Sequence, residues 1–238
     1  MTSFSSYDGT QLWYEVTGDG PPLVCLPGGP GADARSLGTL GGLDARYTLV
    51  TLDGRAGGRS QIPADRASCS FAGQARDVEA LRVHLGLSEP DLLAHSAGTL
   101  TAQEYAVRYG VRRLVLVTPA GRAAREPDPA EGAAIRAQGW SNAEPEDDYP
   151  APPEWLRAAF YGTAESSSPR QLERLRTMRA PVLAVCGARD GIAGTHTSKL
   201  IGELYENCAV EILPAGGHWP WLDDPEGFRE RVSRFLSE

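Results

Sequence analysis

Cysteine and histidine are scarce in this chain of 238 residues, which contains four of each. The cysteines are widely scattered and form no C-x-x-C pair, so the sequence has neither a typical zinc motif nor a redox motif. Cys25 and Cys186 lie inside apolar runs, where cysteine usually acts as a small buried hydrophobic residue. We therefore expect reduced cysteines, no metal site and a cytoplasmic location.

Long apolar runs and an excess of basic charge are also missing. No apolar stretch approaches the roughly 18 residues that a membrane-spanning helix needs. Residues Met1–Tyr7 contain no basic segment and no apolar core, so we expect no signal peptide. The formal net charge is −8, which argues against nucleic acid and anionic membranes as partners. The composition carries no signal for an oligomeric state.

Apolar runs alternate with helical patterns along most of the chain. Continuous apolar runs predict strands buried on both faces of a sheet, at residues 23–26, 47–52, 91–94, 113–117, 181–186 and 210–213. The alternation predicts an α/β fold with a mostly parallel central sheet and helices on both faces. Residues 3–6 and 11–17 read as an antiparallel pair at a sheet edge, joined at Asp8-Gly9.

The composition changes at residues 120–168, which are rich in Ala, Glu, Asp, Pro and Arg and show no strand pattern. Weak helical patterns appear near 129–137 and 153–161. We interpret this segment as a small mobile cap inserted into a core made of residues 1–119 and 169–238. The alternative is a disordered acidic loop, although long structureless loops are uncommon inside a compact domain.

A serine follows the apolar run 91–94 directly, in the segment Ala94-His95-Ser96-Ala97-Gly98, and a helical pattern begins at Thr99. The segment matches G-x-S-x-G except that alanine replaces the first glycine. A serine on such a sharp strand-to-helix turn presents its hydroxyl at the open edge of a sheet, where it can act as a nucleophile. The alternative is a serine that caps an ordinary helix.

A nucleophilic serine needs a base to take its proton and an acid to orient that base. His218 lies in a glycine-flanked loop after the last predicted strand, whereas His84 and His196 are expected on exposed helices. Asp190 follows the strand 181–186. Functional groups of parallel sheets gather at the carboxyl ends of strands. We therefore predict that Ser96, Asp190 and His218 form a catalytic triad.

A glycine-rich loop, Pro27–Gly31, follows the strand 23–26 and can turn backbone N–H groups towards a ligand. The oxyanion of acyl transfer is usually held by two such donors, each worth about 3–4 kcal/mol in the transition state. We predict the N–H groups of Gly29 and Ala97 in this role. The alternative for Pro27–Gly31 is an ordinary tight turn.

These features make the chain similar to α/β-hydrolases over nearly its full length. Pro27–Gly31 resembles the H-G-G-P-G loop of the proline iminopeptidase branch, with proline in place of histidine, and Leu52–Ser60 resembles the D-Q-R-G-x-G-x-S segment of that branch. The resemblance implies that Ser96 is the nucleophile, His218 the base and Asp190 its orienting acid, with no cofactor. That branch usually has G-G-S-W-G at its nucleophile turn and a longer cap.

Acidic cap residues hold the free amino group of the substrate in proline iminopeptidases. The residues of this chain that could do so, or that could instead form a solvated acidic surface, are Glu126, Asp128, Glu131, Glu144, Glu146, Asp147 and Asp148.

We predict a serine hydrolase that cleaves an ester, thioester or amide bond of a small-molecule acyl substrate through an acyl-enzyme. The residues expected to line the substrate site are Gly28, His95, Trp140, Trp155, Phe160, Tyr161 and Trp219. For the aromatic residues among them, packing in the core is the alternative, and His95 is expected either to pack or to line the site.

Other functions remain open at this point. A proline iminopeptidase-like aminopeptidase, or a biosynthetic enzyme that cleaves carbon–carbon bonds, opens lactones, transfers acyl groups or cyclises, could use the same residues. Epoxide hydrolases and dehalogenases of this fold use a carboxylate nucleophile, and position 96 is serine. A non-catalytic ligand receptor would be expected to show a broken triad.

Overall fold

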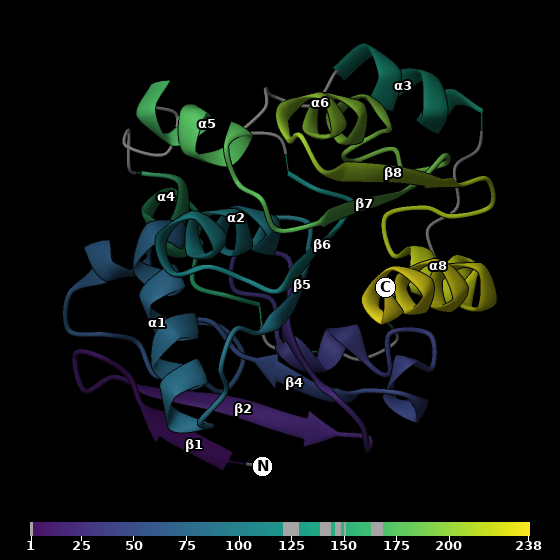
Figure 1. Cartoon of the computed structure of the whole chain (residues 1–238). Coiled ribbons are helices and arrows are strands. Elements are labelled where there is room, and N and C mark those ends of the chain that lie inside the picture. Colours follow the sequence, from purple (N-terminus) through teal and green to yellow (C-terminus); the bar gives the residue numbers. More distant parts are fainter. Residues whose placement is uncertain (1, 121–128, 139–143, 146–148, 150, 163–168) are drawn as a thin grey trace.

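The computed structural model describes residues 2–120, 129–138, 144–145, 149, 151–162 and 169–238. A single eight-stranded sheet crosses the molecule in the order β1-β2-β4-β3-β5-β6-β7-β8 (Figure 1). Its strands are β1 (Thr2–Ser5), β2 (Gln11–Thr17), β3 (Pro22–Leu26), β4 (Thr48–Leu52), β5 (Asp91–His95), β6 (Arg113–Val117), β7 (Val182–Gly187) and β8 (Cys208–Leu213).

The six strands from β3 to β8 run parallel to one another, whereas β1 and β2 form an antiparallel pair at one edge. The predicted mostly parallel sheet with an antiparallel edge is therefore confirmed. β4 lies outside β3, so the chain crosses over before it returns to the middle of the sheet at β5. The carboxyl ends of β3, β5, β6, β7 and β8 consequently meet at one edge.

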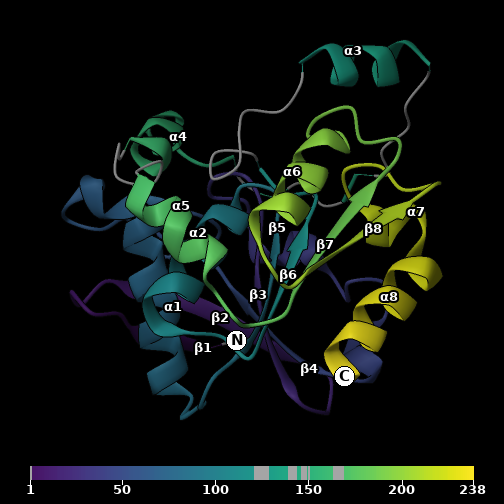
Figure 2. The same cartoon turned by 45° about the horizontal axis from the view of Figure 1, so that its top comes forward.

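Helices cover both faces of the sheet, as Figure 2 shows for α1, α2 and α5 on one side and α8 on the other. The α-helices are α1 (Phe71–His84), α2 (Gly98–Tyr109), α3 (Pro129–Ala137), α4 (Glu154–Tyr161), α5 (Pro169–Arg176), α6 (His196–Leu204), α7 (Pro220–Asp223) and α8 (Pro225–Ser237). Three short 3-10 helices complete the described elements: η1 (Ala34–Leu37), η2 (Leu43–Ala45) and η3 (Arg66–Cys69).

Two apolar clusters fill the spaces between the sheet and its helices. Within β5, Leu92 and Ala94 belong to the cluster under α1, α2, α5 and α6, while Leu93 belongs to the cluster under α7 and α8. Successive strand residues point to opposite faces, so a strand covered on both faces must be apolar at every position. This explains the uninterrupted apolar runs in the sequence.

The inserted segment contributes α3 and α4, close to the two helical patterns predicted for residues 120–168. α4 packs on η3 and on the glycine-rich loop that follows β3. Leu156 of α4 lies so close to Gly31 that a β-carbon there would be 2.4 Å from its Cδ2 atom. The insertion thus contacts the site edge of the sheet, and its description as a separate cap stays a prediction.

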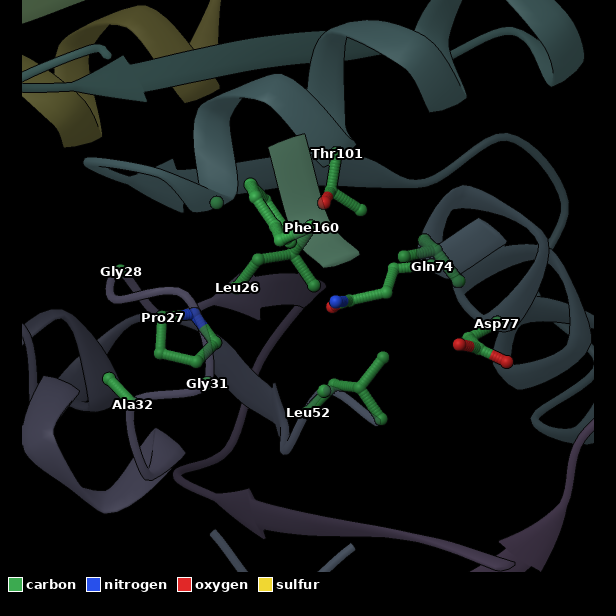
Figure 3. A pocket seen from close by; sticks show the side chains of 13 residues that line it. Leu26, Pro27, Gly28, Gly31, Ala32, Leu52, Gln74, Asp77, Thr101 and Phe160 are labelled. Atoms are coloured by element: carbon green, nitrogen blue, oxygen red, sulfur yellow. The ribbon is translucent and has the colours of Figure 1, made fainter. Parts of the chain in front are cut away.

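A small cavity lies behind the glycine-rich loop, between the ends of β3 and β4 and helices α1 and α2 (Figure 3). Gly28 and Gly98 form one wall, and Phe160 of α4 covers it. Figure 3 shows the Gln74 side chain reaching into the cavity, with Asp77 behind it. The cavity is therefore partly polar.

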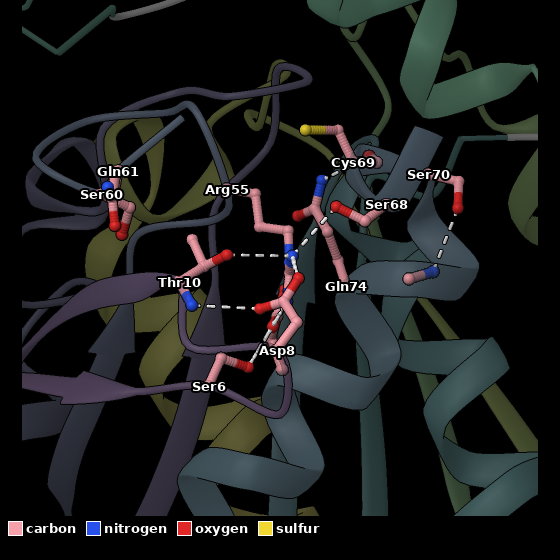
Figure 4. A network of polar contacts seen from close by, with 12 residues as sticks. Ser6, Asp8, Thr10, Arg55, Ser60, Gln61, Ser68, Cys69, Ser70 and Gln74 are labelled. Atoms are coloured by element: carbon pink, nitrogen blue, oxygen red, sulfur yellow. Dashed lines mark hydrogen bonds and ion pairs between the residues drawn. The ribbon is translucent and has the colours of Figure 1, made fainter. Parts of the chain in front are cut away.

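Asp77 also contacts Arg55. Arg55 is the centre of a network of polar contacts that includes Asp8, Thr10 and Ser68 (Figure 4). The Arg55 side chain is 0% exposed, and its guanidinium donates two hydrogen bonds of 2.6 Å to the Asp77 carboxylate. It also donates to Asp8 at 2.5 Å and to Ser68 at 2.9 Å. These contacts join the β1–β2 turn, the loop after β4, η3 and α1, so the network fixes how the edge hairpin sits against the rest of the fold.

Replacing Arg55 by methionine should destabilise the fold strongly. The substitution would leave the Asp77 carboxylate buried without its cation, and breaking a buried pair in this way costs about 3–5 kcal/mol. Urea unfolding of the wild type and of Arg55→Met measures the difference in the free energy of unfolding. The matched control is Arg234→Met, because the Arg234 side chain is 53% exposed and its pair with Glu211 should contribute less than about 1 kcal/mol. Equal losses in the two variants would contradict the role assigned to Arg55.

The Asp8–Arg55 pair should make part of the stability depend on pH. The hydrogen bond from Arg55 lowers the pKa of Asp8 well below its ordinary value of 3.8. The folded state therefore prefers the ionised carboxylate of Asp8. The stability that this preference adds is fully present above pH 3.8 and is lost as the pH falls from 3.8 towards the lower pKa of the folded state. We expect Asp8→Asn to be roughly 1 kcal/mol less stable than the wild type near neutral pH, with a difference that disappears under acid conditions. A difference that stays constant between about pH 6 and pH 2 would contradict this.

Candidate active site

Ser96 occupies a strained turn between the end of β5 and the start of α2. Its φ angle is 48°, in the left-handed region that residues other than glycine rarely adopt. The turn is held from both sides, because the Ser96 N–H donates to the Val117 carbonyl at 2.9 Å and the Ser96 carbonyl accepts from the Thr99 N–H at 3.0 Å. Such strain persists only where the surroundings enforce it, and it is typical of a nucleophile on a strand–turn–helix motif.

Small residues allow this turn to form. A β-carbon on Gly98 would lie 2.3 Å from the Pro27 carbonyl oxygen. A β-carbon on Gly28 would lie 3.0 Å from the Ser96 β-carbon and 2.9 Å from Nδ1 of His95. The glycine-rich loop and the Ser96 turn are thus in direct contact, and both Gly28 and Gly98 are required by close approach.

The structure brings Ser96, His218 and Asp190 together at the carboxyl edge of the sheet. Nε2 of His218 lies 3.1 Å from the Ser96 hydroxyl, and Nδ1 lies 3.0 Å from a carboxylate oxygen of Asp190. Because a carboxylate can only accept, Nδ1 carries the imidazole proton and Nε2 is free to accept from the serine. The three predicted residues therefore form a continuous hydrogen-bonded chain, and Asp190 at its inner end is completely buried.

The backbone of His218 is fixed by two side chains from neighbouring strands. Its carbonyl accepts from Nε2 of His95 at 2.9 Å and from the Thr118 hydroxyl at 3.1 Å. Burial lowers the pKa of His95, which is therefore neutral and donates through Nε2. Of the two placements expected for His95, the structure shows packing, because His95 is buried and its ring supports the His218 loop. Thr118 was not predicted, and its only sequence signal is its place directly after β6.

The loops that carry Asp190 and His218 are also joined to each other. The Arg189 N–H donates to the Gly216 carbonyl at 2.9 Å. A β-carbon on Gly187 would lie 2.1 Å from the same oxygen, so only glycine permits this approach. Asp223 ends α7 and accepts from the Gly217 N–H at 2.7 Å. Its neighbour Asp224 caps α8.

The two predicted oxyanion donors lie beside the serine and in the glycine-rich loop. Ala97 is 1% exposed and directly precedes α2, whose amino-terminal end favours negative charge. Gly29 is on the exposed side of its loop. Within the described part of the chain, neither N–H group donates to a backbone carbonyl. The placement is compatible with an oxyanion hole, which stays a prediction.

Phe160, Tyr161 and Trp219 reach the predicted site. Phe160 is 2% exposed and packs in a cluster with Ala97, and Tyr161 contacts the same cluster from α4. The Trp219 ring stands edge-on to the His218 imidazole, with centroids 5.0 Å apart.

Trp155 lies elsewhere. Trp155 packs in a separate cluster with Cys69, and the guanidinium of Arg66 lies 4.5 Å from the centre of its ring. The expectation that Trp155 lines the substrate site therefore changes to packing on η3. Trp140 lies outside the described residues.

The fold agrees with the comparison to known families. The sequence profile of the family described as "alpha/beta hydrolase fold" matches residues 21–168. The chain belongs to the α/β-hydrolase family. The predicted resemblance and fold class are thereby confirmed.

Individual relatives of this hydrolase include peptidases and esterases. A proline iminopeptidase of Lactiplantibacillus plantarum is 33% identical over 121 residues, which make up 47% of this chain and 42% of that protein. The alignment thus spans less than half of either protein. An esterase from Rhodococcus sp. has a similar structure, with a TM-score of 0.72 and 28% identity. The alignment covers 100% of this chain and 98% of the esterase chain. A proline iminopeptidase-related protein from Thermus thermophilus has a TM-score of 0.76 at 23% identity. The alignment covers 99% of this chain and 96% of that protein's chain.

Two further properties concern the described residues. These residues contain no group of three or more His, Cys, Asp or Glu side chains arranged to hold a metal ion. Among the same residues, every helix is too short or too polar to cross a membrane.

Replacing Gly28 by alanine should disturb the hydrolase site without unfolding the protein. The added β-carbon would push against Ser96 and His95, and a displacement of about 1 Å can cost roughly 100-fold in rate. We expect the rate of p-nitrophenyl acetate hydrolysis to fall about 10- to 100-fold. The control is Gly86→Ala, where a β-carbon meets nothing within 4 Å but the φ of 64° strains an alanine, so it tests whether lost stability alone lowers the rate. Circular dichroism should show both variants folded, and an unchanged rate in Gly28→Ala would contradict the contact.

Proposed function

We propose that this α/β-hydrolase is a serine hydrolase that cleaves an ester, thioester or amide bond of a small-molecule acyl substrate. The observation that carries the proposal is the hydrogen-bonded chain from the Ser96 hydroxyl through His218 to the buried Asp190, with separations of 3.1 and 3.0 Å. In that arrangement the imidazole can take the serine proton, and the carboxylate stabilises the imidazolium that forms.

The proposed reaction proceeds through an acyl-enzyme. Ser96 attacks the substrate carbonyl while His218 takes its proton, and the backbone N–H groups of Gly29 and Ala97 hold the oxyanion. His218 then returns the proton to the leaving group, and the acyl group stays on Ser96. A water molecule, activated by the same imidazole, attacks the acyl-enzyme and releases the acid.

The surroundings of Ser96 favour a compact acyl substrate. Phe160 packs in a cluster with Ala97, the Trp219 ring stands edge-on to the His218 imidazole, and Leu156 of α4 lies against Gly31 of the glycine-rich loop. The likeness to the Rhodococcus esterase over the whole chain also supports ester cleavage. The four free cysteines are consistent with the proposed location in a reducing cytoplasm.

Aminopeptidase activity is the second candidate, favoured by the identity with the proline iminopeptidase of L. plantarum. It would need an acidic cap residue for the amino group of the substrate. Glu131 does not offer a ready site, because its carboxylate accepts hydrogen bonds from Thr195 and His196. Glu144 lies within the described residues. The remaining acidic candidates, Glu126, Asp128, Glu146, Asp147 and Asp148, lie outside them.

A paired substrate panel tests the proposal. We expect hydrolysis of short-chain p-nitrophenyl esters to exceed that of proline p-nitroanilide. Ser96→Ala should lower turnover by several orders of magnitude, on the order of 10⁶ where nucleophile and base act as one unit. Ser3→Ala, an exposed serine of β1, is the control and should match the wild type.

Two outcomes would change this account. Turnover by Ser96→Ala close to that of the wild type would exclude Ser96 as the nucleophile. A preference for proline p-nitroanilide over all the esters would make the aminopeptidase the better description.

A further inference from the structure

Helix α3 of the inserted segment is attached to the loop that carries Asp190. The Glu131 carboxylate accepts the Thr195 N–H at 2.9 Å, the Thr195 hydroxyl at 2.6 Å and the His196 N–H at 3.0 Å. Glu131 precedes β7 in the chain, whereas its two partners follow that strand. The contact therefore links the insertion to the segment between β7 and α6.

Two of the three groups that donate to Glu131 are backbone N–H groups at the start of α6, which have no hydrogen-bond acceptor within that helix. α6 begins at His196, and the side chain of Thr195, its N-cap residue, makes no capping hydrogen bond. The first N–H groups of a helix have no partner within the helix, and its amino-terminal end favours negative charge. Burial alone would raise the pKa of Glu131, but the hydrogen bonds from Thr195 and His196 outweigh it and lower the pKa. Glu131 thus supplies the missing cap as an anion.

Further contacts fix α3 over the same loop. The Arg136 guanidinium donates to the Gly191 carbonyl. A β-carbon on Gly194 would lie 2.5 Å from the Glu131 carboxylate, and one on Gly132 would lie 3.0 Å from the Gly191 oxygen. Glycine at both positions lets the helix and the loop approach closely, so the contact involves both ends of the loop.

The loop between Asp190 and Thr195 is organised around the Asp190 carboxylate. One carboxylate oxygen accepts the N–H groups of Ile192 and Ala193 at 2.8 and 3.0 Å, while the other faces His218. The Asp190 carbonyl accepts the Gly194 N–H at 3.1 Å. The orientation of the carboxylate therefore depends on the conformation of this loop. The end of the loop next to Asp190 is joined to the His218 loop by the hydrogen bond from Arg189 to Gly216. The other end, at Thr195, is held by Glu131.

We propose that Glu131 is a positioning residue, which holds the loop of residues 190–195 so that the Asp190 carboxylate meets His218. In this way the docking of α3 from the inserted segment is coupled to the assembly of the triad. The inference rests on the proposed function, because it assigns Glu131 a role through Asp190. Nothing in it requires Glu131 to contact the substrate.

Removing the Glu131 carboxylate should lower kcat and leave KM nearly unchanged. We expect Glu131→Ala to reduce kcat for p-nitrophenyl acetate about 10- to 100-fold, as for a small misplacement of a catalytic group. The control is Glu154→Ala, which removes an exposed glutamate from the first turn of α4 in the same insertion. Thr195→Val should lower kcat in the same direction, whereas Thr195→Ser, which keeps the hydroxyl, should retain most of it. Circular dichroism checks that each variant is folded.

A double-mutant cycle separates positioning from a general loss of structure. Asp190→Asn alone should lower kcat by about 10⁴-fold, as the corresponding change does in a serine protease. If Glu131 acts through Asp190, adding Glu131→Ala to Asp190→Asn should change kcat by less than about twofold. A full additional loss in that background, or an unchanged kcat in Glu131→Ala, would overturn the inference. An unchanged kcat in Asp190→Asn would instead contradict the proposed triad, and the role of Glu131 with it.

Discussion

The hydrogen bond between Asp190 and His218 depends on two loops that meet at one edge of the sheet. β7 and β8 are parallel neighbours, so their carboxyl ends lie side by side and the residues that follow them can touch. The two loops approach closely at Gly187 and Gly216. Ser96 follows the carboxyl end of β5 and therefore lies at the same edge of the sheet. Without the parallel register of these strands, the three side chains would not form one chain of hydrogen bonds.

Polar contacts hold the backbone of the site residues at this edge of the sheet. The His218 carbonyl is held by His95 and Thr118, each from the end of a central strand. The strained Ser96 turn is held by the Val117 carbonyl. Preorganised groups of this kind need little rearrangement during a reaction, which is the physical advantage of building a site on strand ends. The Arg55 network acts further away and fixes the edge hairpin against α1.

The sequence was sufficient to predict the sheet, most helices and the grouping of Ser96, Asp190 and His218. Strands buried on both faces are apolar throughout, and the chemistry-bearing residues follow such strands in the order of this fold. The position of β4 outside β3 has no local signal, because strand order depends on long-range packing. The hydrogen bonds of Thr118 with His218 and of Glu131 with Thr195 and His196 have no local signal for the same reason, since the partners are distant in sequence. For Trp155 the sequence left two placements open, because an aromatic residue on a short amphipathic helix can face either neighbour.

The most direct test of the account is covalent labelling with a fluorophosphonate probe, followed by mapping of the adduct by mass spectrometry. The account predicts a single adduct on Ser96 that is absent in Ser96→Ala and forms much more slowly in His218→Ala, because the imidazole activates the serine. Labelling that persists in Ser96→Ala at the wild-type rate, or no labelling of the folded wild type, would contradict an activated serine at this position.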